Sequence, residues 1–391
     1  MRVEPQTATT PASSLRNIQL TLLLLAAASL FALPFLGHAR NRLLSGQPIG
    51  LPAALSLAGP WPAAALATAI ALLLAPSLRP ASAAARWIAL LGAGLALAAA
   101  AALAAAAAAG LAAAASPSAR TSLGPGAWLF AALLLLLASD TARRLSRPTL
   151  AVAAVILVFA PLALLVWHGD LAPLSLFREY AAQHETFRAA LARHVVLVLA
   201  ALVPALLIGL PLGIAAQRSA KLRRIAFPAL NLIQTIPSIA LFGLLIGPLS
   251  ALGAIIPGIA GVGLVPAILA LVLYSLLPIV RNTVEGLDGV PRDVRTAARA
   301  MGMSPAQAFL RVDAVLALPV LLAGLRITTV QAIGLAAISA LIGAGGLGAI
   351  IFQGLFANAL DLVVLGALPV IALAVAADLG FRLLATWAQP A

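Results

Sequence analysis

The sequence predicts an all-α polytopic membrane protein with about ten transmembrane helices. Of its 391 residues, 63% are hydrophobic and only 9% are charged, and the mean hydropathy is +1.10. Because a soluble protein carries roughly a quarter charged residues, this chain has too little charge to cover a soluble surface. Apolar runs of roughly 20 residues, the length that crosses a bilayer as a helix, recur from end to end. These observations exclude a soluble enzyme, a disordered protein and a collagen-like chain.

Each apolar run is interpreted as one span. The predicted spans cover 18–36, 61–77, 87–115, 127–138, 149–167, 194–216, 225–249, 262–280, 319–343 and 361–385. The first has an alternative interpretation as a signal peptide cleaved after Gly37-His38-Ala39. Its apolar stretch is longer than that of a usual signal peptide, so we expect an uncleaved span.

The placement of arginine predicts the orientation of the spans. Lys and Arg total 24 against 11 Asp and Glu, which gives a net charge of +13. With the N-terminus in the cytoplasm, most basic residues fall in cytoplasmic loops, as the positive-inside rule requires. The tryptophans lie at or beside predicted span ends, where indole rings prefer the headgroup level: Trp61, Trp87, Trp128, Trp167 and Trp387. The positive charge therefore reports topology, and we expect membrane lipid and no nucleic acid as a partner.

The chain changes character near residue 168. The later spans contain proline and polar side chains, which at membrane depth usually face a bundle interior or a pathway. The prolines are Pro204, Pro211, Pro228, Pro237, Pro266, Pro278 and Pro319. The polar residues are Asn231, Gln234, Thr235, Ser238, Thr328, Thr329 and Gln331. We expect 1–169 to be an accessory membrane region of about five spans, and 170–391 to be the working domain.

The segment 174–193 joins these two regions. Phe177, Tyr180, Phe187 and Leu191 recur at a spacing of three to four residues, with charged residues on the other faces. This pattern predicts an amphipathic helix on the outer membrane interface. The alternative is a connector that packs on its own protein.

The cytoplasmic loop 281–318 carries the most informative pattern. Val294, Ala297, Ala298 and Met301 predict one apolar helix face, with Arg295 and Arg299 together on another. Gly302 suits a left-handed residue at the end of this helix. Ser304-Pro305-Ala306-Gln307 predicts a capping box that opens a second helix, which carries Phe309. Two short helices with basic residues and an exposed Phe suit a plug that docks into another protein; the alternative is an ordinary hairpin.

The segment Thr296-Ala297-Ala298-Arg299-Ala300-Met301-Gly302 resembles the EAA motif of binding-protein-dependent ABC importer permeases, which have the MetI-like fold. The resemblance implies that the last five spans form a MetI-like core and that the loop docks on a separate ATPase. It also implies a substrate-binding protein and a second permease subunit, identical or homologous. The implied coupling residues are Arg295, Thr296, Ala297, Ala298, Arg299, Gly302 and Phe309. Thr296 stands where the motif has Glu, and Ala314-Val315 stands where Leu-Pro would follow.

Two further segments resemble the glycine betaine and osmoprotectant branch of this family. They are Asn231 to Ser238, which resembles an IQTIPS span, and Leu341 to Gly348, which resembles an IGAGGLG element. The extra N-terminal spans resemble the longer YehY-type permeases. The implied location is a bacterial inner (plasma) membrane.

Intramembrane polarity predicts the substrate pathway, and a glycine run predicts a gate or helix break. The pathway residues are Asn231, Gln234, Thr235, Pro237, Ser238 and Gln331, and the glycines are Gly343, Gly345, Gly346 and Gly348. The chain has no P-loop, and its only lysine is Lys221. We therefore expect no enzyme activity here and ATP hydrolysis on a partner.

The sequence shows no metal site and no cofactor site. The four histidines, His38, His168, His184 and His194, lack metal-ligand spacing. The predicted function is import of a small osmoprotectant such as a glycine betaine-like or choline-like quaternary amine. The alternatives are an ABC permease for another small solute such as an amino acid, an ion-coupled secondary transporter, and a membrane-anchored assembly protein.

Overall fold

The computed structural model confirms an all-α fold with one small sheet. It describes residues 12–41, 46–78, 82–113, 118–145 and 148–387. The chain forms two compact units, Met1–Ala181 (unit 1) and Ala182–Ala391 (unit 2). The division falls inside the segment 174–193.

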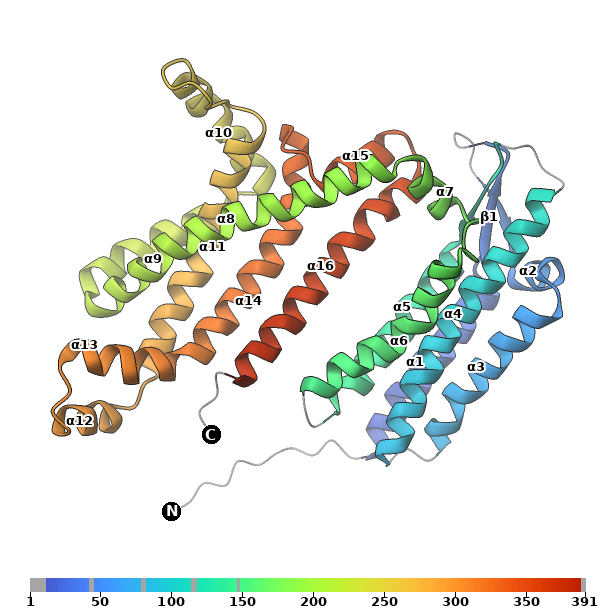
Figure 1. The fold of residues 1–391 in the computed structure, drawn as a ribbon, viewed down its shortest axis with the longest axis horizontal. Helices are drawn as coiled ribbons and strands as arrows, with labels where there is room; N and C mark the ends of the chain where they lie inside the picture. The colour runs from blue at the N-terminus through green and yellow to red at the C-terminus, as the bar shows by residue number, and fades with distance from the viewer. Residues whose placement is uncertain (1–11, 42–45, 79–81, 114–117, 146–147, 388–391) are drawn as a thin grey trace. The chain divides into compact units, whose positions relative to one another are not determined.

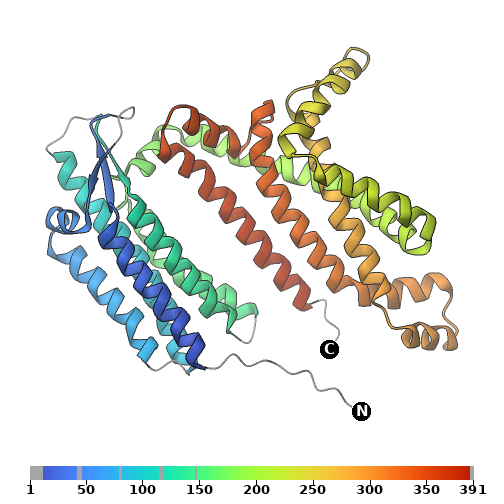
Figure 2. The same ribbon diagram turned by 180° about the vertical axis from the view of Figure 1, so that it is seen from behind.

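Unit 1 is a helix bundle with a sheet at one end (Figure 2). Its long helices are α1 (Ala12–Ala32), α3 (Pro60–Leu78), α4 (Ala83–Ala113), α5 (Pro125–Arg143) and α6 (Pro148–His168). Two short helices, α2 (Leu51–Ala58) and α7 (Ser175–Ala182), complete it. α4 packs against α2, α3, α5 and α6, because its many small residues allow close approach. For example, Gly94 lies directly against the backbone of Val158 on α6.

The sheet has the antiparallel order β2-β1-β3. Its strands are β1 (Leu36–Ala39), β2 (Gln47–Ile49) and β3 (Arg120–Leu123). Leu36 pairs with Ile49 on one side and with Leu123 on the other. This sheet cannot be predicted from the sequence, because strands of three or four residues beside long apolar runs leave no periodic pattern.

Unit 2 is built around α11 (Leu264–Asp288), which packs between α8 (His184–Arg218) and α14 (Ala314–Ile338). Gly209 and Gly213 of α8 lie against Ile279 and Thr283 of α11, so these two helices approach closely. The remaining helices are α9 (Ala220–Thr235), α10 (Ser238–Gly253), α12 (Arg292–Ala300), α13 (Pro305–Ala308), α15 (Leu347–Phe356) and α16 (Leu360–Trp387). Figure 1 shows α12 and α13 at one end of unit 2 and α15 at the other.

The described residues contain seven helices long and apolar enough to cross a membrane, or eight if one bent pair counts as a span. A count of about ten is therefore not confirmed. The bent pair is α9 and α10, which meet at 104°, so the segment predicted as one span over 225–249 is a broken span or a re-entrant loop. Pro237 has no N–H to continue the helical ladder, and it favours extended backbone at Ile236, whose ψ is 126°.

The segment 174–193 is not one helix. α7 ends at Ala182, Gln183 takes a non-helical conformation with ψ near 24°, and α8 then runs unbroken from His184 to Arg218. Half of the expected interfacial helix is therefore the first part of a long apolar helix, because no helix-breaking residue separates 184–193 from the span that follows.

Candidate coupling loop and translocation pathway

The loop between α11 and α14 contains the two short helices that the sequence predicts. Gly302 ends α12 with φ of +78°. The N–H of Gly302 donates to Arg299 O (2.9 Å) and that of Met303 to Ala298 O (3.2 Å), which together form a Schellman motif. Ser304 and Gln307 form the predicted capping box at the start of α13. The glycine corner and the capping box are both confirmed.

The surface of α12 differs from the predicted apolar face. Only Ala298 is buried; Val294 is 38% exposed and Met301 is 69% exposed. Thr296, Ala297 and Arg299 also face solvent. The corner therefore presents a mixed surface of apolar and basic side chains.

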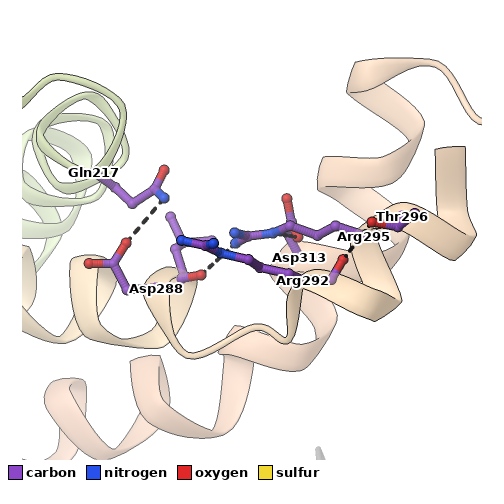
Figure 3. A network of polar contacts seen from close by, with 7 residues as sticks. Gln217, Asp288, Arg292, Arg295, Thr296 and Asp313 are labelled. Atoms are coloured by element: carbon purple, nitrogen blue, oxygen red, sulfur yellow. Dashed lines mark hydrogen bonds and ion pairs between the residues drawn. The ribbon is translucent and has the colours of Figure 1, made fainter.

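Arg295 does not join Arg299 on that surface. Its guanidinium pairs with Asp313 (Nε to Oδ1, 2.8 Å) and donates from Nη2 to Leu287 O (2.5 Å), as Figure 3 shows. Leu287 precedes the loop and Asp313 ends it, so Arg295 holds the two flanks of the loop together. Arg295 and Arg299 lie at i and i+4 on α12, as predicted, but only Arg299 is exposed, because Asp313 draws the side chain of Arg295 inward.

Phe309 is half-buried rather than a free exposed plug. The guanidinium of Arg218, at the end of α8, lies 5.2 Å from the centre of its ring. Asp288, at the end of α11, accepts from Gln217 (3.2 Å; Figure 3). Asp288 also pairs with Arg223 (2.9 Å). The corner between α8 and α9 therefore contacts both the start and the second half of the loop.

The structure brings four of the six predicted pathway residues together at the bend between α9 and α10: Gln234, Thr235, Pro237 and Ser238. Asn231 lies one turn earlier on α9 and is exposed. Gln331 is half-buried on α14, and within the described ranges no hydrogen bond joins it to the bend.

The side chain of Gln234 is held by a backbone carbonyl of α11 that has no helical N–H donor. Tyr274 O would accept from the N–H of residue 278, but that residue is Pro278, which has none. Gln234 Nε2 donates to this carbonyl instead, at 2.8 Å. The Tyr274 hydroxyl in turn donates to Ile236 O, inside the bend. The glutamine of α9 thus supplies the hydrogen-bond donor that the proline of α11 lacks.

The glycine segment, residues 343–348, interrupts the helical structure between α14 and α15. Gly343, Gly345 and Gly346 have φ of +80°, +80° and +78°, a region that side chains disfavour. Gly348 packs against Ala337 O, so closely that a Cβ there would lie 1.8 Å from it.

Two residues of α8 that were not predicted for this region contact the glycine segment or the helix before it. Arg193 Nε donates to Ala344 O (3.1 Å), within the segment. The fully buried His194 lies beside Gly346 and donates from Nε2 to Ile333 O of α14 (3.1 Å). These contacts cross more than a hundred residues of sequence, so no local pattern could have indicated them.

Arg326 of α14 pairs with Asp378 of α16 (3.4 Å), which also pairs with Arg382 (2.7 Å). Among the described residues, no group of three or more His, Asp or Glu is arranged to hold a metal ion.

Comparison with known proteins decides the family. Residues 205–389 match the family described as "Binding-protein-dependent transport system inner membrane component", and residues 15–177 match "ABC transporter permease YehY, N-terminal domain". The osmoprotectant import permease protein OsmW of Salmonella typhimurium is 42% identical over 48% of this chain and 84% of its own length. The chain belongs to the binding-protein-dependent ABC transport permeases.

Other relatives of the permease have related names. The choline transport system permease protein OpuBB of Bacillus subtilis is 38% identical over 47% of the chain and 80% of its own length. The ergothioneine transport permease/ergothioneine binding protein EgtU of Helicobacter pylori is 43% identical over 44% of the chain and 29% of its own. A solved chain of the MetNI methionine ABC transporter has 23% identity, covers 54% of the chain and 99% of its own, and has a TM-score of 0.48.

Proposed function

We propose that this permease carries a small osmoprotectant, a quaternary amine of the glycine betaine or choline class, into a bacterial cell, driven by a separate ATPase. The observation that carries this proposal is the 42% identity to OsmW across most of that protein. The names of other relatives, which include choline and carnitine permeases, support the substrate class. A binding protein would select the solute outside, and the permease would provide a path of low affinity.

The exposed part of α12 and α13 would dock on the ATPase. Arg299 and Met301 project from a corner that is fixed by the Schellman motif and the capping box. The chain then continues through 309–313 directly into α14. A displacement of the docked corner would therefore pass along α14 towards the glycine segment, and the pathway would open to the other side.

The two regions would have different tasks. Residues 170–391 would form the transport domain, paired with a second permease subunit, and 1–169 would be an accessory membrane region. The permease would lie in the inner (plasma) membrane of a bacterium, with its N-terminus in the cytoplasm. A chain that begins at residue 170, assayed beside the full chain, tests this division: ATP-driven uptake is expected from both.

Reconstitution in vesicles distinguishes the candidate mechanisms. With the purified permease alone, we expect no solute uptake under a proton or sodium gradient. Adding the ATPase, the binding protein and ATP should start uptake. Uptake by the permease alone under an ion gradient would establish a secondary transporter and contradict the proposal, and no uptake in either case would favour an assembly protein.

The substrate class is tested on the binding protein by calorimetry. Glycine betaine, choline and carnitine should bind, whereas an amino acid such as methionine should not. Binding of the amino acid alone would replace the proposed substrate class while leaving the ATP-driven mechanism intact.

Docking of the loop is tested by charge reversal. We expect Arg299→Glu to reduce co-purification of the ATPase, because Arg299 is exposed at the docking corner. The matched control is Arg224→Glu, an equally exposed arginine on α9 outside the loop. Equal co-purification of the two variants would remove Arg299 from the docking surface.

A further inference from the structure

The corner between α8 and α9, residues 217–223, is a fixed turn. Ser219 both ends α8 and begins α9: its N–H donates to Ala215 O (3.0 Å), and its hydroxyl accepts from Leu222 N–H (3.3 Å). The N–H of Arg223 then donates to Ser219 O (2.9 Å). With both helix ends satisfied through one residue, a force on the corner moves the start of α9 with it.

This corner is attached to both flanks of the coupling loop. Asp288, just before the loop, is bound by Gln217 and Arg223, one on each side of the turn. Phe309, in the second half of the loop, lies under the Arg218 guanidinium. Phe309 also begins a π-helical segment, 309–313, and such irregular turns often accompany function.

The other end of α9 is attached to the pathway bend. Gln234 donates to Tyr274 O, and the Tyr274 hydroxyl donates to Ile236 O. α9 has 16 residues and is therefore about 24 Å long. Pro228 removes one hydrogen bond from the middle of α9, but the remaining backbone hydrogen bonds still resist shortening, so a displacement at one end of the helix reaches the other.

We propose that α9 is a second transmission route from the coupling loop to the pathway, and that Arg218 and Phe309 are the positioning residues that engage it. The covalent route through α14 moves the glycine segment. The contact between Arg218 and Phe309 moves α9, and with it the bend that carries Gln234, Thr235 and Ser238. The inference rests on the proposed ATP-driven function. In this account the contact between Arg218 and Phe309 makes α9 and α14 move at the same time.

Uptake and ATP hydrolysis measured in the same vesicles test the proposal, with a choline-loaded binding protein as the probe. For Arg218→Gln we expect the solute taken up per ATP to fall about twofold to fivefold, the equilibrium factor of one cation–π contact at a partly exposed site. The ATPase should still co-purify, because Arg218 lies outside the loop. Arg218→Lys keeps the cation and should restore the ratio. Arg224→Gln, the same charge change six residues later on α9, is the control: in the described part of the chain the Arg224 side chain has no ion pair or hydrogen bond.

A double variant separates this contact from a general effect. Phe309→Leu should also lower the ratio, and Phe309→Leu with Arg218→Gln should lower it no further than the larger single effect. The proposal is overturned if Arg218→Gln matches Arg224→Gln, if the two effects multiply in the double variant, or if Arg218→Gln releases the ATPase. Failure of the unaltered complex to show ATP-dependent uptake would instead contradict the proposed function itself.

Discussion

The two units place their polar contacts differently. Among the described residues of unit 1, polar contacts between different elements include two at helix ends or in the sheet, His38 to Thr121 (2.9 Å) and Arg86 to Arg144 O (2.6 Å). In unit 2 they join helices within the bundle, as Gln234 joins Tyr274 O and His194 joins Ile333 O. Unit 2 also has an interior proline in each of α8, α9, α10, α11, α14 and α16.

The physical cost of these features explains the difference. A free carbonyl or a polar side chain inside a bilayer is expensive unless a partner satisfies it. Unit 1 carries such an interior proline in α6, Pro161, and otherwise relies on the packing of small apolar residues. Unit 2 accepts the cost and supplies partners, which places bends at defined positions. The helices of unit 1 therefore pack closely, whereas those of unit 2 bend at defined positions.

Gly348→Ala should have the largest effect, because it tests close packing where unit 2 bends. The added Cβ would lie 1.8 Å from Ala337 O, a backbone atom that cannot yield cheaply. We expect the free energy of unfolding to fall by about 3 kcal/mol and uptake to be lost. Gly334→Ala on α14 is the control, since nothing lies within 4 Å of its Cβ position. Similar stability of the two variants in detergent would show that α15 is not held as described.

Gly94→Ala is the matched change in unit 1. Its Cβ would lie 2.7 Å from Val158 O, between α4 and α6. We expect a loss of about 2 kcal/mol in stability, while the protein that remains folded still transports. Thermal unfolding and vesicle uptake measure the two effects separately. Loss of uptake by the folded fraction would show that unit 1 takes a direct part in transport, and would contradict the different roles given to the two units.

Gln234→Leu tests the substitution of a side-chain donor for a backbone donor. It leaves Tyr274 O without a partner, which should lower stability by about 1–2 kcal/mol. In a Pro278→Ala background the backbone N–H returns and the carbonyl no longer needs Gln234. We therefore expect Gln234→Leu to have little effect on stability there, as denaturation of the four variants would show. An equal loss in both backgrounds would separate Gln234 from the proline.

Asp378→Asn should have the smallest effect. Asp378 pairs with Arg326 of α14 and Arg382 of its own helix, and all three side chains are about a third to a half exposed. Removing the charge should lower stability by about 0.5 kcal/mol. Arg382→Gln breaks only the contact within α16 and is the comparison variant. A change well above 1 kcal/mol for Asp378→Asn would mean that the pair is shielded from water.

Features determined by neighbouring residues could be predicted from sequence. Gly302 and the pair Ser304 and Gln307 act within four residues of the turn that they form, so their roles follow from local chemistry. Composition likewise predicts a membrane protein, because helices that cross a lipid bilayer need apolar residues however they are connected.

Features determined by packing could not be predicted. Arg295 has an exposed position by helical spacing alone, and only the approach of Asp313 turns it inward. Gln234 was predicted from its polarity, yet its partner depends on a proline 44 positions later that happens to face it. The partners of Arg193 and Arg326 could not be predicted for the same reason: Ala344 and Asp378 lie on distant segments that become neighbours only after folding.

The most direct test of the central claim is solute uptake by the reconstituted complex in vesicles that hold no ion gradient. Labelled choline is supplied with its binding protein, and ATP or a non-hydrolysable analogue is enclosed with the ATPase. The account predicts accumulation with ATP and none with the analogue. Equal accumulation in both, or accumulation without the ATPase, would contradict it.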